Sequence, residues 1–130
     1  MIGSVRMDGS SACMTIEGAT DADVFAAYVK EVLCPTLRPS DIVIMDNLGA
    51  HKRASTIALI EQCGASVKFL PTYSPDLNPI EMMWSKLKAW LRNAQARNHE
   101  SLLEAIAQGL HAITPKDAAH WFARCGYNFI

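Results

Sequence analysis

Hydrophobic and polar positions at the start of the chain alternate as in a β-hairpin and then repeat as in a helix. Residues 1–7 and 11–17 read as two strands, and Asp8-Gly9 between them readily takes the positive φ angles of a tight turn. Apolar residues then recur at helical spacing from Val24 until Pro35 stops the pattern. This region therefore predicts strand, strand, helix.

A strand, a helix and a second strand are predicted next. Residues 41–46 form a short continuous apolar run, which is typical of a central strand covered on both faces. A helix is expected over about residues 52–63, with Gly64 as a left-handed cap just past its end. Residues 67–70 then form another short strand.

The C-terminal half is predicted to be helical after a loop. Residues 72–79 are rich in Pro, Ser, Asp and Asn, with Asn78 as the expected N-cap and Pro79 at the first helical position. Apolar faces predict three successive helices, from Pro79 to Leu91, over residues 101–110 and over residues 114–126. With no repeat and no internal linker, residues 1–130 read as a single α/β domain.

Composition narrows the possible functions. The chain has 130 residues, is 50% hydrophobic and has a net charge of −1, so it lacks the basic excess of a protein that holds nucleic acid by its overall field. Any DNA contact must come from a local patch. The four cysteines are scattered and read as reduced thiols, and no apolar stretch is long enough for a membrane span. The expected location is therefore the cytoplasm.

Two carboxylates carry the candidate chemistry. Asp46 ends the apolar run 41–46, Glu81 opens a later helix, and 34 residues lie between them. A carboxylate at the C-terminal end of a buried strand faces the crevice where open α/β sheets bind ligands. A second carboxylate from the later helix would complete a site for Mg²⁺ or Mn²⁺, which favour oxygen ligands. The alternative for Glu81 is stabilisation of its own helix start.

A group of three consecutive residues, shortly after Asp46 in the chain, is a candidate for ligand contacts. His51, Lys52 and Arg53 lie at the expected start of a helix, whose free N–H groups favour an anion. His51 either orients a ligand or helps to cap the helix.

The helix that carries Glu81 has cations on the same face. Ser85, Lys88 and Arg92 follow Glu81 at steps of four, three and four residues. This stripe suits a phosphodiester backbone, or it is an ordinary solvated face.

Two sequence blocks carry a family resemblance. Residues 45–52, Met-Asp-Asn-Leu-Gly-Ala-His-Lys, and residues 70–84, which include Tyr-Ser-Pro-Asp-Leu-Asn-Pro-Ile-Glu and a downstream Trp, resemble the catalytic core of DDE superfamily transposases. More narrowly, they are similar to the bacterial insertion-sequence branch related to the mariner elements. The separation of 34 residues matches that branch, and the resemblance extends over nearly the whole chain.

The resemblance implies a ribonuclease H-like fold, a mixed sheet flanked by helices. In such a fold two acids from adjacent strands and one from a later helix hold two Mg²⁺ or Mn²⁺ ions for cleavage and transfer of DNA strands at transposon ends. Asp46 matches the second acid and Glu81 the third. The implied neighbours that orient these ligands are Asn47 and His51, and the candidate DNA contacts are Lys52, Arg53, Lys88 and Arg92.

The first acid of the family has no matching position in this sequence. It belongs to an opening strand ahead of the hairpin, and the family's helix-turn-helix region also lacks a counterpart. The chain is therefore expected to be the C-terminal part of a transposase, without the first strand and poorly active alone. The expected partners are transposon-end DNA and either a second copy of the chain on DNA or an upstream-encoded transposase segment. When bound to DNA, the protein is expected to associate with the nucleoid.

Two other functions are considered. A noncatalytic module derived from a transposase would bind a full-length transposase or its DNA and inhibit it, and the missing first acid favours this alternative. A phosphotransferase that uses Asp46 as nucleophile is disfavoured, because Leu48 stands where a second acid is usual and no Gly-rich phosphate loop is present.

Overall fold

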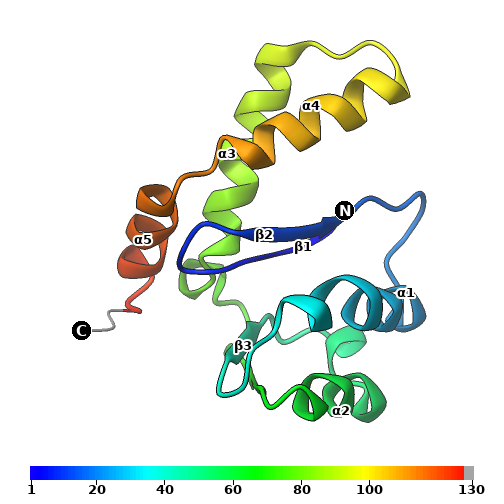
Figure 1. Ribbon diagram of the computed structural model, residues 1–130, viewed down its shortest axis with the longest axis vertical. Coiled ribbons are helices and arrows are strands. Elements are labelled where there is room, and N and C mark those ends of the chain that lie inside the picture. Colours follow the sequence, from blue (N-terminus) through cyan, green and yellow to red (C-terminus); the bar gives the residue numbers. More distant parts are fainter. Residues whose placement is uncertain (128–130) are drawn as a thin grey trace. The chain divides into compact units, whose positions relative to one another are not determined.

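The computed structural model describes residues 1–127 and has a mixed α/β structure with five α-helices and two small sheets (Figure 1). By its internal contacts the chain divides into two compact units. The first unit contains residues 1–4 and 12–78, and the second contains residues 5–11 and the chain from Pro79 onward. Within the described residues, no helix has both the length and the apolar character that a bilayer crossing requires.

The expected hairpin is confirmed. Strands β1 (Ile2–Val5) and β2 (Ser11–Met14) pair with each other, and Asp8-Gly9 lies in the turn between them. Asp8 Oδ1 accepts hydrogen bonds from the backbone N–H and the hydroxyl of Ser10, at 2.9 and 2.6 Å. Gly9 has a φ of 91°, a conformation that costs glycine little. Asp8 is thus a turn residue.

Helix α1 (Ala22–Tyr28) continues into a π-helical segment, Val29–Leu33. Asp21 caps the helix, because its carboxylate accepts a hydrogen bond from the Val24 N–H at 2.8 Å. The inward side of this long helical segment supplies much of the first unit's core, namely Phe25, Tyr28, Val29 and Leu33.

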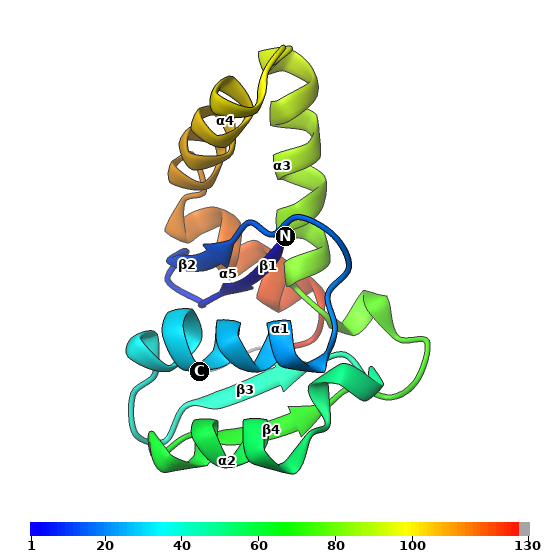
Figure 2. The same cartoon turned by 90° about the vertical axis from the view of Figure 1, so that its right-hand side faces the viewer.

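Strands β3 (Ile42–Met45) and β4 (Ser66–Phe69) are parallel and joined by helix α2 (Ala54–Gln62), which forms a β-α-β unit (Figure 2). Helix α2 begins two residues later than predicted, because residues 49–51 form a separate 3₁₀ turn. Gly64 after the helix has a φ of 81°, which confirms the predicted left-handed cap.

The sheet differs from the single mixed sheet that the sequence predicted. Within residues 1–127 the hairpin and the β3–β4 pair form two separate two-stranded sheets. Val43 and Met45 of β3 pack into the core, whereas Ile42 is 56% exposed. The prediction of a strand covered throughout on both faces was therefore wrong for Ile42, because an uninterrupted apolar run does not reveal which side chains are covered.

One hydrogen bond links α1 to the hairpin inside the first unit. Tyr28 is 2% exposed, and its hydroxyl donates to the carbonyl oxygen of Ala12 in β2 at 2.7 Å. This bond satisfies the only polar atom of a ring that is otherwise surrounded by apolar side chains, as buried tyrosines require.

The second unit contains three helices: α3 (Ile80–Ala94), α4 (His99–His111) and α5 (Pro115–Arg124). The predicted inner face of α3 is confirmed, with Met83 and Leu87 buried. In α4 the buried residues are Ala105 and Gly109. A Cβ atom on Gly109 would lie 2.7 Å from Leu87 Cδ1, so the small residue permits close packing of α4 on α3.

We predict that Tyr28→Phe lowers the free energy of unfolding at neutral pH by about 0.5–1.5 kcal/mol, because it removes one hydrogen bond. Burial raises the pKa of Tyr28 from 10.0 to about 12. The folded protein therefore keeps this proton while the unfolded chain loses it. The stabilisation that comes from burying the protonated hydroxyl of Tyr28 is complete below pH 10 and is lost as the pH rises toward 12.

Urea denaturation at several pH values tests this expectation, with wild type losing more stability than Tyr28→Phe between pH 10 and 12. Tyr73→Phe is the control, because the Tyr73 side chain is 96% exposed and its hydroxyl should not affect the stability. Identical pH slopes for wild type and Tyr28→Phe would contradict the assignment.

Candidate active site

Asp46 follows directly after β3 and is half-buried at the C-terminal end of the parallel pair. Its carboxylate Oδ1 accepts a hydrogen bond from Asn78 Nδ2 at 2.9 Å. One carboxylate oxygen is thereby held by a side chain of the first unit. A hydrogen bond to an ionised acceptor is stronger than a neutral one, so this contact fixes the orientation of Asp46.

Asn78 was predicted to be the N-cap of α3, and this prediction was wrong, because the N-cap position belongs to Pro79. Asn78 is 7% exposed, and its amide nitrogen donates to the carboxylate of Asp46. That partner lies 32 residues away in the chain, so the local sequence does not reveal the contact.

His51 is held against the same strand end. Its Nδ1 lies 3.1 Å from the backbone carbonyl oxygen of Asp46, and its ring packs on Phe25 with 4.3 Å between the ring centroids. A carbonyl oxygen can only accept, so Nδ1 carries the proton and Nε2 is the acceptor in the neutral ring. His51 therefore supports the backbone that presents Asp46 and does not cap α2.

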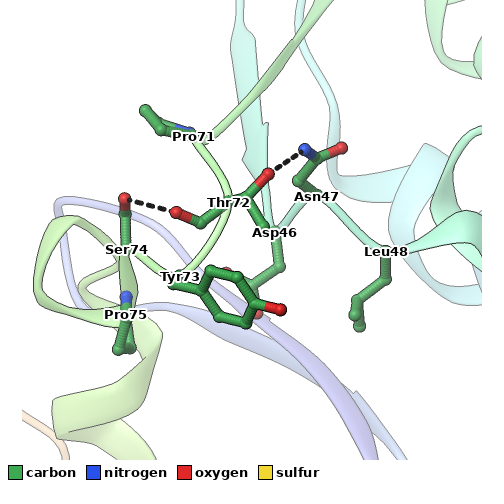
Figure 3. A pocket seen from close by; sticks show the side chains of 8 residues that line it. All are labelled: Asp46, Asn47, Leu48, Pro71, Thr72, Tyr73, Ser74 and Pro75. Atoms are coloured by element: carbon green, nitrogen blue, oxygen red, sulfur yellow. Dashed lines mark hydrogen bonds between the residues drawn. The ribbon is translucent and has the colours of Figure 1, made fainter.

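A hollow of about 220 Å³ adjoins Asp46 within the first unit (Figure 3). Residues 46–48 form one wall and residues 71–75 the other. Asn47 Nδ2 donates to Thr72 Oγ1 at 3.0 Å and thus ties the two walls together. Asn47 Oδ1 is buried without a hydrogen-bond partner in the described part of the chain.

Two large apolar side chains of this hollow are exposed. Tyr73 is 96% exposed and Leu48 is 55% exposed, and they extend from opposite walls (Figure 3). Tyr73 also has a φ of 58°, in the left-handed region that non-glycine residues seldom adopt.

A model of the family described as DDE superfamily endonuclease matches residues 1–103. The chain belongs to this family. The matched range includes both Asp46 and Glu81 and ends inside α4. No curated protein matched the chain.

Membership places this DDE superfamily endonuclease among nucleases, and enzymes of the family are typically metal-dependent. The family also implies a ribonuclease H-like fold. The oxygen chemistry of Asp46 suits Mg²⁺ or Mn²⁺. However, no group of three or more His, Cys, Asp or Glu side chains suitable for a metal ion occurs among residues 1–127.

Glu81 lies in the first turn of α3, in the second unit of the endonuclease. Its side chain is exposed, and a carboxylate in the first turn stabilises a helix through its dipole, as the alternative explanation for this acid expects. Ser85, Lys88 and Arg92 are exposed as well, which is consistent with the predicted stripe on one face of α3.

The cations near Asp46 have different environments. Arg53 forms an ion pair with Asp23 at 2.6 Å, and both side chains are solvent-exposed. Lys52 Nζ lies 5.8 Å from the centre of the Phe69 ring, within the range of a cation–π contact. Lys52 is therefore the more available cation for a phosphate, since the charge of Arg53 already has a partner.

Sequence reasoning missed two features of the endonuclease site. Asn78 was assigned to helix capping, and Tyr73 was assigned only to a loop. Asn78 is far from Asp46 in the sequence, and exposure of a loop side chain depends on packing. The signal available in the sequence was that both residues lie in the same motif as Glu81.

We predict a favourable coupling between Asp46 and Asn78. In a double-mutant cycle with Asp46→Ala and Asn78→Ala, the coupling free energy should be about 1.5–3 kcal/mol, as for a hydrogen bond to a charged group. Chemical denaturation of the four proteins measures it. As a control, Glu61→Ala on the exposed side of α2 should combine additively with Asn78→Ala. Additivity for Asp46 and Asn78 as well would show that their contact is not formed in solution.

Proposed function

We propose that this chain is the catalytic part of a transposase of the bacterial insertion-sequence branch related to mariner elements. Its reaction is divalent-metal-dependent cleavage and transfer of DNA strands at transposon ends. The observation that carries the proposal is the carboxylate of Asp46, held by Asn78 at the end of a parallel strand inside an exposed hollow. Ligand sites of open α/β sheets lie at such strand ends.

The sequence motif supports the assignment of Asp46 and Glu81 as joint ligands. The two acids are separated by 34 residues, a spacing that resembles the insertion-sequence branch, and both lie in the range that the family model matches.

The proposed roles follow from these positions. Asp46 and Glu81 would hold Mg²⁺ or Mn²⁺, which activates the attacking oxygen and stabilises the leaving oxygen of a phosphodiester. Asn78 orients the Asp46 carboxylate and leaves its other oxygen for a ligand. His51 supports the backbone of Asp46, and Asn47 joins the two walls of the hollow. Positioning residues of this kind affect metal affinity and activity by about 10- to 100-fold.

The unpaired edge of β3 could accept a further strand from another segment. Ser66 and Leu70 of the neighbouring strand segment donate their N–H groups to the carbonyls of Asp41 and Met45. Successive residues of a strand direct their backbone N–H and C=O groups to alternate edges. The backbone groups of Ile42 and Ile44 therefore point to the edge of β3 that faces away from β4. Within residues 1–127, no strand pairs there. A parallel strand added at this edge would end beside Asp46, where it could supply the missing first acid.

The partners in this proposal are transposon-end DNA, an upstream-encoded transposase segment and a second copy of the chain on DNA. Exposed cations suited to phosphates are Lys52, Lys88 and Arg92, with Arg53 available only if it leaves Asp23. These contacts are local, which agrees with the net charge of −1.

The second candidate function is a noncatalytic module that binds a full-length transposase or its DNA and inhibits it. The same open edge of β3, together with the lack of a three-ligand cluster in the described residues, favours it. For this function we predict that the chain forms a mixed complex with a full-length homologue in gel filtration or displaces it from DNA. If it does neither, an inhibitory role is excluded.

For the transposase we predict Mn²⁺-dependent nicking of DNA that carries the element's ends when the chain is combined with its encoded upstream segment. Asp46→Asn or Glu81→Gln should reduce nicking to background, because each removes a charged ligand. Gel electrophoresis of end-labelled DNA measures both strands. Nicking by residues 1–130 alone would show that the family's first acid is not required from another segment.

Matched carboxylate variants control for loss of charge. Asp76→Asn and Glu100→Gln change exposed acids that lie outside the proposed ligand set, and nicking should remain at the wild-type rate. Equal activity of wild type, Asp46→Asn and Glu81→Gln would exclude the proposed mechanism.

A further inference from the structure

We propose that the hollow beside Asp46 is a nucleobase subsite, in which Tyr73 and Leu48 hold one unpaired base of the DNA strand. The inference rests on the proposed function, because it names how the DNA substrate of that site is bound. It concerns the first unit alone, since every residue that lines the hollow belongs to that unit.

Tyr73 is the first observation. Its ring is 96% exposed, so it adds almost nothing to the core, and its backbone adopts a left-handed φ of 58°. Such strain in a non-glycine residue persists where the surrounding structure imposes it, and it concentrates at functional sites. Here Pro71 and Pro75 restrict the segment on either side of Tyr73. The segment therefore presents a large planar ring to solvent beside an acid.

The opposite wall provides the second apolar surface. Leu48 is 55% exposed and extends from the segment that follows Asp46 (Figure 3). The hollow of about 220 Å³ exceeds the ~150 Å³ of a cavity that holds one benzene ring. It can accept one planar ring system.

The hollow is already formed without a ligand. The hydrogen bond from Asn47 Nδ2 to Thr72 Oγ1 ties its walls together, and Ser74 Oγ donates to the carbonyl oxygen of Thr72 at 3.4 Å. A preformed site loses little conformational freedom on binding.

A nucleobase fits these features better than a phosphate does. An apolar aromatic platform offers no positive charge to an anion, whereas the face of any base can stack on it. The carboxylate of Asp46 borders the hollow, so a neutral base is the compatible occupant in the absence of a metal ion. A DNA strand can then place the base against Tyr73 while an adjoining phosphate approaches Asp46.

The base must be unpaired to reach Tyr73. In a duplex both faces of a base are covered by its neighbours, so entry requires a single-stranded or unstacked nucleotide. The subsite therefore predicts a preference for distorted or single-stranded DNA near the cleaved phosphate. Since stacking depends little on base identity, the preference is structural rather than sequence-specific.

The test uses residues 1–130 and a fluorescent single-stranded (dT) oligonucleotide, first in EDTA and then with Mn²⁺. Loss of one stacked base corresponds to about a 5- to 150-fold weaker Kd. Tyr73→Ala should show a loss in this range and Tyr73→Phe should stay close to wild type. Leu48→Ala should weaken binding, whereas Leu103→Ala, at a leucine 37% exposed on α4, should not.

A second readout distinguishes stacking from general loss of affinity. Oligonucleotides with 2-aminopurine at one position should show fluorescence quenching on binding to wild type and Tyr73→Phe, and none with Tyr73→Ala. Unchanged Kd and quenching in Tyr73→Ala would overturn the subsite. An unchanged melting temperature of Tyr73→Ala shows that the variant is folded, as its exposure predicts.

Failure of the subsite and failure of the transposase proposal give different results. In the chain combined with its upstream segment, Glu81→Gln should abolish nicking and leave 2-aminopurine quenching intact, because Glu81 does not line the hollow. Quenching that depends on Tyr73, in a protein that does not nick DNA even with its encoded upstream segment, supports the subsite and removes the transposase assignment. Normal nicking with no effect of Tyr73→Ala on binding supports the transposase and removes the subsite.

Discussion

The hydrogen bond between Asn78 and the carboxylate of Asp46 is the contact on which the candidate site depends. It connects the end of a parallel strand to the loop before α3, two segments that the chain separates by a helix and a strand. Because Asn78 is buried and Asp46 is half-buried, each polar group satisfies the other in a place where an unpaired one would be costly. The position of Asp46 is thus fixed by the packing of two segments that are distant in the chain.

The surroundings of Asp46 combine rigidity with exposure. His51 packs on Phe25 and contacts the backbone of Asp46, and Asn47 ties this segment to Thr72. The core below is closed by long apolar side chains from α1, α2 and the parallel strands. Above that core, Tyr73 and Leu48 remain in solvent. A rigid base with an exposed apolar rim suits the binding of a substrate that is partly aromatic and partly charged.

The second unit is built on a different packing principle. Small residues on α4 allow it to approach α3, and the Trp90 indole N–H donates to the carbonyl oxygen of Ala105 at 3.0 Å. This arrangement leaves one face of α3 free for Glu81, Lys88 and Arg92, all of which are exposed. The helix therefore uses one side for stability and the other for polar residues, as its amphipathic pattern requires.

The sequence by itself determined the order of strands and helices, the Asp-Gly hairpin turn, the left-handed cap at Gly64 and the inner face of α3. These features depend on residues within a few positions of one another. It also singled out Asp46 and Glu81, through the motifs around them. Only the tertiary structure decided that Asn78 binds Asp46, that Gly109 packs against α3, that the strands form two separate sheets, and that Tyr73 is exposed. Each of these features depends on segments that are distant in the chain. Local periodicity does not show which of these segments come into contact.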